Sequence, residues 1–381
     1  MSVDTAPTPE AADSDRHTLG RHTLGRHTLG RHTLAEIVSQ PDTWAAAYAL
    51  LAEQSGALAA AWQRAQPRQV VFTGCGSTYH LARSAAAVLQ GMTGVPARGI
   101  PASEVALHPA QTLADPAQTL LVALSRSGTT TETAAALDSF RRAGGRQVWG
   151  ITCTPNTPIA DESDFVLLTD MAQEQSVAQT RSFSTMLFVA QGMAAVIGGA
   201  GPTPLAGLPD AARRLIELTY GLARQWGTEA GLDRFFYLGG GPLYGVACEA
   251  ALKMKEMSIS HSEAYHVLEF RHGPKALLDD TALVVGLLGK RDLRHEAPVL
   301  QEAAQLGATT LALVPGQAGA GHVTVHLPED VPWWAMPVLY LPVVQVMALA
   351  RAQHKGINAD APRNLSAAVH LDRASFSEGA A

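Results

Sequence analysis

Short apolar runs alternate with amphipathic, alanine-rich segments along most of this chain. We predict three buried strands in its first half, at Gln69–Thr73, Thr119–Ala123 and Gln147–Thr152. Helices are predicted before and between them, over residues 35–65, from Leu81, and through Thr133–Leu137. Because strands and helices alternate, the pattern predicts an α/β fold with parallel sheets, whose ligands bind at the carboxyl ends of the strands.

This order of elements occurs twice. Residues 235–247 align with residues 70–82, and each segment holds a strand, three small residues, a tyrosine and an alanine-rich helix. Thr281–Leu287 likewise aligns with Thr119–Ser125, and a third strand follows over Thr310–Val314. The chain is therefore predicted to be two copies of one unit. We place a first domain at 35–204, a second at 205–372 and a tail at 373–381.

Residues 16–34 form a different kind of repeat, four copies of Arg-His-Thr-Leu with a period of five. The period suits neither a helix nor a strand, so we interpret residues 1–34 as a flexible tail without chemistry. The alternative is metal binding by the evenly spaced histidines, which are His17, His22, His27 and His32.

The segment with the clearest chemistry is a hydroxyl-rich turn between a predicted strand and a predicted helix. Ser125, Ser127, Thr129 and Thr130 stand together there with one glycine, Gly128. Free backbone N–H groups and the positive end of a helix point outward at such a turn, and hydroxyls add further donors. The turn is predicted to bind an anion such as phosphate. The alternative is an ordinary helix cap rich in serine and threonine.

The two copies differ in this respect. The second copy reads Leu-Leu-Gly-Lys-Arg over residues 287–291, so only the first is expected to hold phosphate in this way. The second copy instead carries Glu249, Lys253 and Glu256 on one helix face, at positions i, i+4 and i+7. Such a trio can be a solvated, salt-bridged surface. Apolar residues are interleaved with it, however, which favours a functional role.

Composition and charge narrow the class of protein. The 381 residues are 47% hydrophobic with a net charge of −6, which predicts a globular protein without a nucleic-acid partner. The sequence contains no run of 18 apolar residues, so we expect no membrane span. Cys75, Cys153 and Cys248 have no metal-ligand spacing, so we expect a reduced, cytoplasmic protein without a metal. We also expect no cofactor, because Gly74-Cys75-Gly76 lacks the remainder of a nucleotide fingerprint.

Six motifs in one order carry a resemblance to a known family. They are Gly74–His80, Ser125–Thr133, Glu249–Glu256, His261–Tyr265, Arg271–Pro274 and Asp360–Leu365. From about Glu36 to Val369 the chain resembles sugar isomerase (SIS) domain proteins. It is similar to the isomerase half of glutamine–fructose-6-phosphate aminotransferases and to stand-alone amino-sugar-phosphate deaminases and isomerases. The resemblance implies two SIS domains, each a five-stranded parallel sheet flanked by helices in a three-layer, flavodoxin-like α/β arrangement.

The resemblance also implies roles for individual residues. It places the phosphate of a sugar phosphate on Ser125, Arg126, Ser127 and Thr130, with Thr78 beside them and with Gly76 and Ser77 as further substrate contacts. Glu256 corresponds to a proton-shuttling carboxylate, Lys253 to a substrate-side cation and His272 to a ring-opening acid–base group. The family implies that His272 comes from a neighbouring subunit, so we expect a homodimer.

Two departures from the aminotransferase pattern shape the expected reaction. No cysteine precedes Cys75, so we expect no glutaminase domain and no glutamine-dependent synthesis. The family's Schiff-base lysine falls on Ala367, so an amine that could hold a ketose covalently is missing at that position. We therefore expect a deaminase/isomerase that converts a hexosamine 6-phosphate, glucosamine 6-phosphate in the first instance, to a ketose 6-phosphate and ammonia.

Two alternatives remain open at this point. One is an aldose–ketose isomerase that handles no amine, or a ketosamine-phosphate deglycase. The other is a sugar-phosphate sensor without catalysis. The sequence does not choose between hexose epimers, such as glucosamine and galactosamine 6-phosphate.

Overall fold

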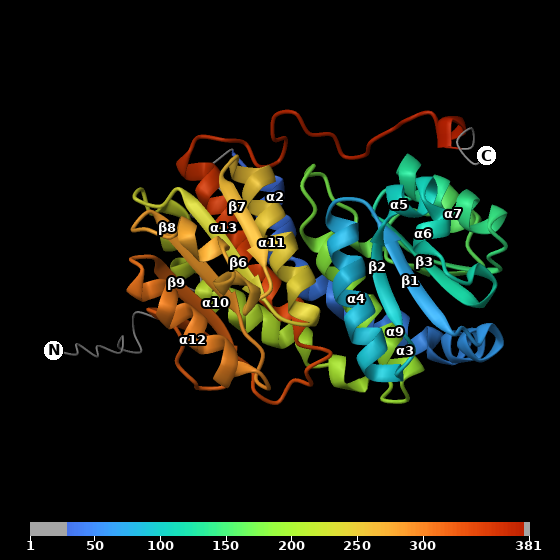
Figure 1. Cartoon of the computed structure of the whole chain (residues 1–381), viewed down its shortest axis with the longest axis horizontal. Helices are drawn as coiled ribbons and strands as arrows, with labels where there is room; N and C mark the ends of the chain where they lie inside the picture. Colours follow the sequence, from blue (N-terminus) through green and yellow to red (C-terminus); the bar gives the residue numbers. More distant parts are fainter. Residues whose placement is uncertain (1–28, 377–381) are drawn as a thin grey trace.

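The computed structural model describes residues 29–376 as two parallel β-sheets with helices around and between them (Figure 1). The strands are β1 (Gln69–Gly74), β2 (Ala97–Pro101), β3 (Thr119–Ser125), β4 (Gln147–Thr152), β5 (Phe165–Leu168), β6 (Arg234–Gly239), β7 (His261–Tyr265), β8 (Ala282–Leu287), β9 (Thr309–Pro315) and β10 (Val323–Leu327). The helices are α2 (Arg31–Val38), α3 (Gln40–Ala65), α4 (Ser77–Thr93), α5 (Ala102–Leu107), α6 (Pro109–Thr112), α7 (Thr131–Arg142), α8 (Pro158–Asp161), α9 (Arg181–Ile197), α10 (Leu208–Thr228), α11 (Pro242–Ser258), α12 (Leu293–Gln305) and α13 (Leu341–His354).

Both sheets have the same topology. The first has the order β2-β1-β3-β4-β5, and the second, read from its other edge, has the order β7-β6-β8-β9-β10. Every pairing is parallel. The prediction of an α/β fold with two five-stranded parallel sheets is confirmed. In each sheet the order in which successive strands are added reverses, between β1 and β3 in the first and between β6 and β8 in the second, and open parallel sheets bind ligands at such a crevice.

The internal repeat extends to the backbone angles. Gly76, which precedes α4, has φ 56° and ψ −120°, and Gly241, 165 residues later, precedes α11 with φ 52° and ψ −126°. Glycine adopts a positive φ without the steric cost that other residues meet. The helix after the first turn was predicted from Leu81 but begins at Ser77, because the turn at Gly76 leads directly into it.

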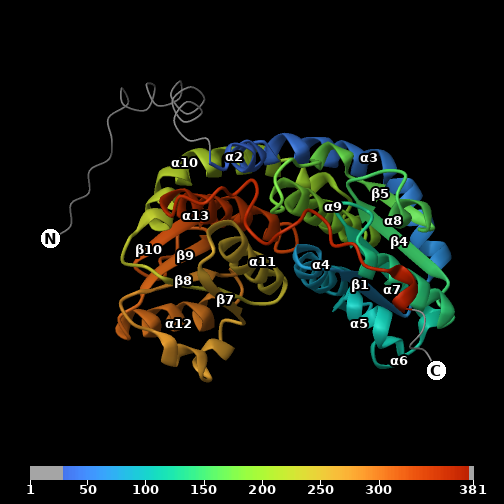
Figure 2. The same cartoon turned by 90° about the horizontal axis from the view of Figure 1, so that it is seen from above.

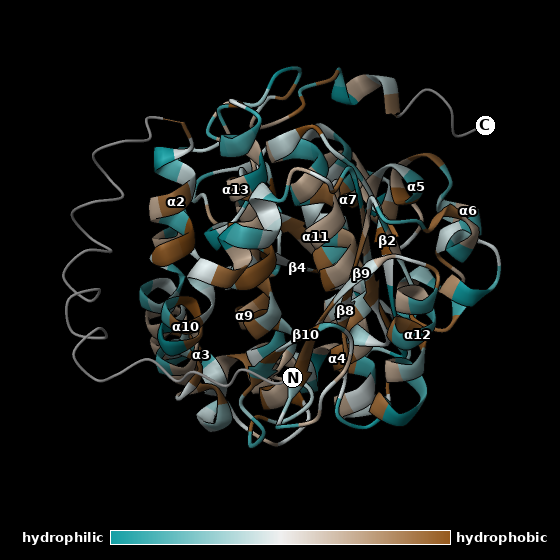
Figure 3. Cartoon of the chain, turned by 90° about the vertical axis from the view of Figure 1, so that its left-hand side faces the viewer, coloured by the Kyte–Doolittle hydropathy of each residue, from teal (hydrophilic) through white to brown (hydrophobic). Residues whose placement is uncertain are grey.

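Each sheet lies between two layers of helices. On the outer face of the first sheet, α5 and α7 pack against Val71, Leu121 and Ala123. On the outer face of the second, α12 packs against β6, β8 and β9. The inner layer contains α3, α4 and α9 from one half and α10, α11 and α13 from the other, and one hydrophobic core joins them (Figure 2). Outer helices such as α12 carry both polar and apolar residues (Figure 3), which suits helices that bury one face.

The two halves meet most closely where α4 packs against α11, side by side in the middle of the molecule (Figures 1 and 2). A Cβ atom at Gly245 of α11 would lie 2.5 Å from the backbone oxygen of His80 on α4. Only glycine permits so close an approach of the two backbones. This contact joins the first turns of the two helices, and the second half of α11 meets the start of α4 where Lys253 donates a hydrogen bond to Ser77. Within residues 29–376, no helix is both long and apolar enough to span a membrane.

The first helix begins at Arg31, a few residues before the predicted start of the folded chain at residue 35. Residues 31–34, which we had assigned to the tail over 1–34, form the start of α2, and α2 packs against α13. Thr33 is fully buried, and Asp360 Oδ1 accepts hydrogen bonds from its backbone N–H and its hydroxyl, both at 2.8 Å. A long-range partner therefore stabilises the last repeat copy as a helix. The other repeat histidines, His17, His22 and His27, lie outside the described residues.

The other end of the chain crosses between the halves. Residues 360–373, here called the C-terminal strap, leave the second half near α13 and run over the first half to α7 (Figures 1 and 2). Arg373 ends the strap with ion pairs to Asp138 on α7 at 2.7 Å and to Glu162 after α8 at 2.8 Å. The proposed boundaries at 372 and 373 therefore need correction, because these residues pack on the first domain and Arg373 begins a short 3₁₀ helix.

Candidate active site

A cavity of about 210 Å³ lies at the carboxyl ends of β1 and β3, where the strand order of the first sheet reverses. We call it the central cavity, because both halves of the molecule contribute to its wall. The lining residues are Cys75, Gly76, Ser77, Thr78, Arg126, Ser127, Thr130, Val177, Ala178, Gln179, Glu256 and residues 365–369 of the C-terminal strap. The structure thus brings together most of the residues that the sequence singled out, from four separate segments.

One end of the central cavity is suited to an anion. Gly76, Ser77 and Thr78 begin α4, and Thr130 is the N-cap of α7, so two helix N-termini open on the same space. The first turn of a helix leaves backbone N–H groups without partners in the helix and carries partial positive charge. The hydroxyls of Ser127 and Thr130 lie 3.4 Å apart at this wall. Donors and charge together fit a phosphate group.

Ser125 is placed differently from the other members of the hydroxyl-rich turn. It is buried and does not line the central cavity. Its Oγ accepts a hydrogen bond from the backbone N–H of Gly128 at 3.0 Å and lies 3.3 Å from Thr130 Oγ1. The side chain therefore maintains the shape of the turn from behind. In this structure Ser125 supports the groups that face the cavity and is not itself one of them.

Arg126 connects the wall of the cavity to the strap. Its guanidinium donates hydrogen bonds to the backbone oxygen of Val177 at 3.0 Å and to that of Ala367 at 2.6 Å. A buried carboxylate, Glu174, lies 3.8 Å away. The arginine thus holds residue 367 over the cavity while it supplies positive charge to the cavity wall. The sequence analysis predicted the positive charge of Arg126 at the cavity but not its contact with residue 367.

The trio on α11 forms a chain of charges beside the central cavity. Lys253 is fully buried, and its Nζ lies 3.3 Å from Oε1 of the buried Glu249. The same ammonium forms an ion pair with Glu256 and donates a hydrogen bond to Ser77 Oγ at 3.1 Å. Glu256 is the member of the trio that lines the cavity, with a side chain 20% exposed. The alternative of a solvated helix face is wrong, because α4 covers this side of α11.

The environment of the trio sets its charges. Burial alone would lower the pKa of Lys253, but the carboxylates of Glu249 and Glu256 outweigh burial and raise it. Lys253 therefore remains an ammonium ion and not a free amine. Burial raises the pKa of Glu249 to about 8, against the attraction of Lys253. A fixed cation next to a cavity-lining carboxylate can stabilise negative charge on a substrate oxygen while the carboxylate transfers a proton.

His272 lies away from these groups in the same chain. It follows a short 3₁₀ helix, Glu269–Arg271, is exposed, and does not line the central cavity. Its neighbour Arg271 is held by Glu302 of α12 at 2.6 Å. The structure of one chain therefore does not bring His272 to Glu256.

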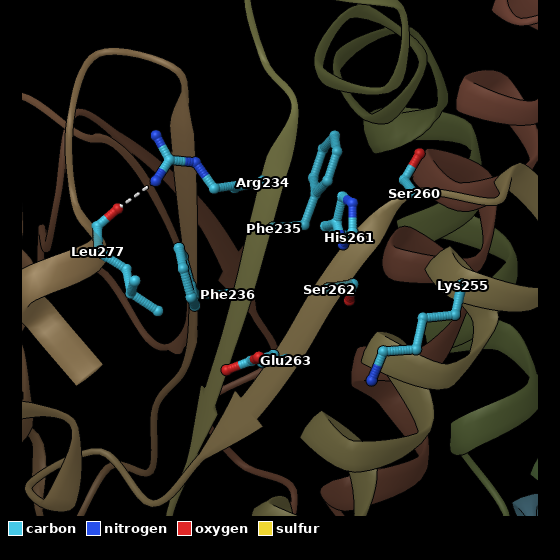
Figure 4. Close-up of a pocket in the computed structure, with 9 residues that line it drawn as sticks. All are labelled: Arg234, Phe235, Phe236, Lys255, Ser260, His261, Ser262, Glu263 and Leu277. Atoms are coloured by element: carbon cyan, nitrogen blue, oxygen red, sulfur yellow. Dashed lines mark hydrogen bonds between the residues drawn. The ribbon is translucent and has the colours of Figure 1, made fainter. Parts of the chain in front are cut away.

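Other titratable residues near the trio in sequence also lie elsewhere. Lys255, His261 and Glu263 line a separate cavity of about 370 Å³ along β6 and β7 (Figure 4). On its far side, Arg234 donates a hydrogen bond to the backbone oxygen of Leu277 at 2.7 Å (Figure 4). Of the charged residues that crowd this part of the sequence, only Glu249, Lys253 and Glu256 thus lie beside the central cavity.

Two parts of the cavity were not among the predicted site residues. Cys75 lines it, but burial raises the pKa of its thiol to about 11, so the sulfur is not a thiolate nucleophile near neutral pH. The strap was signalled only by the Asp360–Leu365 motif, and its position over the cavity follows from long-range contacts. Ala367, where the family pattern has lysine, lies in the cavity wall.

We expect replacement of Arg126 by glutamine to weaken substrate binding more than it slows turnover. Hydrogen bonds from a charged donor contribute about 1.5–3 kcal/mol each, so a rise in KM of roughly 10- to 100-fold is expected. Steady-state kinetics with a sugar phosphate would measure it. Arg142→Gln, at the far end of α7, is the matched control. Equal kinetics for the two variants would contradict a role for Arg126 at the cavity.

Comparison with proteins of known sequence supports this picture. The SIS domain model matches residues 65–196 and 231–320. A glutamine–fructose-6-phosphate aminotransferase [isomerizing] from Symbiobacterium thermophilum is 32% identical over 323 residues, which is 80% of this chain and 52% of that protein. Its counterpart in Pseudomonas syringae is 32% identical, over 81% of this chain and 52% of the relative. The chain spans about half the length of these relatives.

Solved structures show the same arrangement. A glucosamine-6-phosphate deaminase from Thermotoga maritima is 28% identical with a TM-score of 0.74, over 89% of this chain and all of that one. A tagatose-6-phosphate ketose/aldose isomerase from Escherichia coli shares the fold, with a TM-score of 0.79 at 24% identity, over 87% of this chain and 95% of the other. With the family model matching both halves and two parallel five-stranded sheets of the same order, the chain belongs to the SIS domain family.

Proposed function

We propose that this protein is an amino-sugar-phosphate deaminase/isomerase. The substrate is a hexosamine 6-phosphate, glucosamine 6-phosphate in the first instance, and the products are fructose 6-phosphate and ammonia. In the open-chain substrate a proton leaves C2 and one is added at C1, which turns the aldehyde and amine into a ketose imine. Water then adds at C2 and ammonia departs. Atoms and charge balance with water as the only co-reactant and without an oxidant.

Glu256 is proposed to move the proton. It is the carboxylate that lines the central cavity, and a single carboxylate can take a proton from one carbon and return it to the next. As the proton leaves C2, negative charge develops on the oxygen at C1. The ammonium of Lys253, paired with Glu256 and held by Ser77, is near enough to stabilise that charge. The turn at Ser127 and Thr130 would hold the phosphate.

The observation that carries the choice of a deaminase is the pairing of an intact Glu256–Lys253 system with Ala367 in the same cavity wall. Lys253 is buried and charged, so it does not act as a Schiff-base amine in place of a lysine at 367. A site that moves protons but does not hold a ketose covalently suits hydrolysis of the imine. The similarity to the Thermotoga maritima deaminase over that protein's whole length supports the same reaction.

Opening the sugar ring requires an acid–base group. His272 of the same chain does not line the central cavity and so cannot supply that group there. We infer a homodimer in which the exposed loop around His272 reaches the central cavity of the neighbouring subunit. Imidazole suits this step near neutral pH. A reduced, cytoplasmic setting agrees with Cys75, Cys153 and Cys248, all of which are free thiols.

The deciding experiment follows ammonia and fructose 6-phosphate together while the purified protein is incubated with glucosamine 6-phosphate. Both products are expected in equal amounts, and galactosamine 6-phosphate tests the epimer. Isomerised sugar without ammonia from amine-free phosphosugars would establish the alternative aldose–ketose isomerase. Release of an amine from ketosamine phosphates would establish a deglycase. Binding of sugar phosphates with no turnover of any of these compounds would leave a sensor.

A further inference from the structure

The last copy of the Arg-His-Thr-Leu repeat is the first turn of α2, and a distant residue caps it. Gly30 stands at the N-cap with φ 75° and has no side-chain oxygen to accept from the first N–H groups of the helix. Asp360, at the root of the C-terminal strap, accepts from them instead. Its Oδ2 accepts a hydrogen bond from the N–H of His32 at 3.2 Å, and its Oδ1 accepts one from that of Thr33 at 2.8 Å. The strap thus holds the start of α2.

Asp360 also connects α2 to the wall of the central cavity. Its backbone oxygen accepts a hydrogen bond from the N–H of Val177 at 3.0 Å. The backbone oxygen of Val177 accepts one from Arg126 at 3.0 Å, and Arg126 donates another to the backbone oxygen of Ala367 at 2.6 Å. Val177, Arg126 and Ala367 all line the central cavity. Hydrogen bonds therefore lead from the first turn of α2 to three residues of the cavity wall.

A second residue of α2 holds the same part of the wall. Residues 173–180, here called the cavity loop, precede α9 and supply Val177, Ala178 and Gln179 to the central cavity. Glu36 of α2 is buried, and its Oε1 accepts hydrogen bonds from the backbone N–H groups of residues 175 and 176, at 2.6 Å and 3.2 Å. Its other oxygen accepts from the Ser176 hydroxyl. Three successive N–H groups of the cavity loop are thus bound by α2 or by its capping residue.

We propose that α2, including the last repeat copy, is a positioning element of the active site, with Thr33, Glu36 and Asp360 as its positioning residues. None of the three lines the central cavity. They act through the cavity loop and the strap, which supply residues 177–179 and 365–369 to its wall. An irregular segment keeps one conformation where its backbone groups have partners, and a binding site needs its wall held closely in place. The last repeat copy therefore has a role that the earlier interpretation as a tail without chemistry did not give it.

A positioning role and a merely structural role for α2 have different kinetic consequences. If α2 only stabilised the fold, loss of its contacts would reduce the fraction of folded enzyme and so lower Vmax, while the folded molecules kept their KM. If α2 positions the cavity wall, loss of the same contacts leaves a folded protein whose cavity loop and strap move more freely. Substrate binding then weakens, and KM rises.

The first test measures backbone hydrogen exchange of the full-length protein by mass spectrometry. In Asp360→Ala, and to a smaller extent in Thr33→Val, peptides that cover residues 173–180 and 360–373 are expected to exchange faster, by about tenfold in Asp360→Ala. Thr324→Val is the matched control, because Thr324 on β10 also forms hydroxyl hydrogen bonds, to Ala320 in the second half. It should leave exchange in the cavity loop unchanged. Circular dichroism and a thermal melt establish that each variant is folded.

The second test is the KM for glucosamine 6-phosphate, and this arm rests on the proposed function. Asp360→Ala is expected to raise KM roughly 3- to 30-fold, with a smaller change in kcat. Because Asp360 acts on Arg126 through Val177, the effects of Asp360→Ala and Arg126→Gln on KM should be less than additive in the double variant. Thr324→Val should keep the KM of the unaltered protein.

The inference and the proposed function can fail separately. Unchanged exchange at residues 173–180 in folded Asp360→Ala and Thr33→Val proteins would overturn the inference. A lower Vmax with an unchanged KM would overturn it as well, because that result assigns α2 a structural role alone. If the unaltered protein turns over no sugar phosphate, the proposed function fails, and the exchange measurement still decides whether α2 positions the cavity loop and the strap.

Discussion

Glu256→Gln is expected to abolish ammonia release almost completely, with a fall in kcat of roughly 10²- to 10⁴-fold, the usual contribution of a positioned acid–base group. The amide has the size of the carboxylate and can still accept a hydrogen bond from Lys253, but it cannot take a proton from carbon. Because Glu256 lies at the wall of the cavity and is partly exposed, the exchange should disturb the fold little. Coupled assays for ammonia and fructose 6-phosphate would measure the rate.

The control is Glu263→Gln. Glu263 is an exposed carboxylate on β7 that lines the separate cavity of Figure 4 and not the central cavity. Its replacement should leave kcat within about twofold, as is usual for a surface change away from the site. An active Glu256→Gln protein, at a rate near that of Glu263→Gln, would rule out Glu256 as the proton-transfer group.

Lys253→Met is expected to inactivate the protein and, where Glu249 is ionised above its pKa of about 8, to destabilise it by about 3–5 kcal/mol, because a buried carboxylate is then left without its partner. Glu249 is the residue left behind: both of its oxygens are buried, and Lys253 lies 3.3 Å away. Equilibrium unfolding in urea would measure the free energy of unfolding. The double variant Lys253→Met/Glu249→Leu should recover most of the stability and none of the activity, because it removes both charges.

The sign of the pH dependence follows from Glu249. Its pKa is raised in the folded protein to about 8, above the ordinary value of 4.5, so the folded state holds a proton that the unfolded state has lost between these two values. The free energy of unfolding should therefore fall as pH rises across that interval, and over a wider interval in Lys253→Met, where no cation opposes the effect of burial. Equal stability of this variant at pH 5 and pH 8 would contradict the assignment.

Several parts of this picture were accessible from the residues alone. The strands at 69–74 and 147–152 each contain a short apolar stretch, and the turn at 125–130 concentrates hydroxyls between a strand and a helix. Such patterns involve neighbouring residues only. They determine the backbone conformation that a segment prefers and the side chains that lie close together because they are close in sequence. The spacing of Glu249, Lys253 and Glu256 likewise placed them on one helix face, as the structure confirms.

Other parts depended on contacts between distant segments. Nothing in the sequence near Thr33 indicates that Asp360 binds it, so residues 31–34 looked like a continuation of the repeat. Ser125 and Ser127 have equal chemistry in the sequence, and only the path of the turn separates a buried support from a group at the cavity. Glu296 of α12 is buried but could not be distinguished from a surface glutamate, because its burial depends on the turns at Gly240 and Gly289, which the second sheet brings together.

The sequence by itself determined the alternation of strands and helices, the duplication and the residue types available for phosphate binding and proton transfer, because each is written in neighbouring positions. Tertiary structure decided which of these residues share a cavity, which carboxylates are buried and what charge they carry. The packing of α4 on α11 makes Lys253 a fixed cation beside Glu256, and the C-terminal strap closes the same cavity from 240 residues away. Desolvation and long-range contact are properties of the folded chain, so no local pattern contains them.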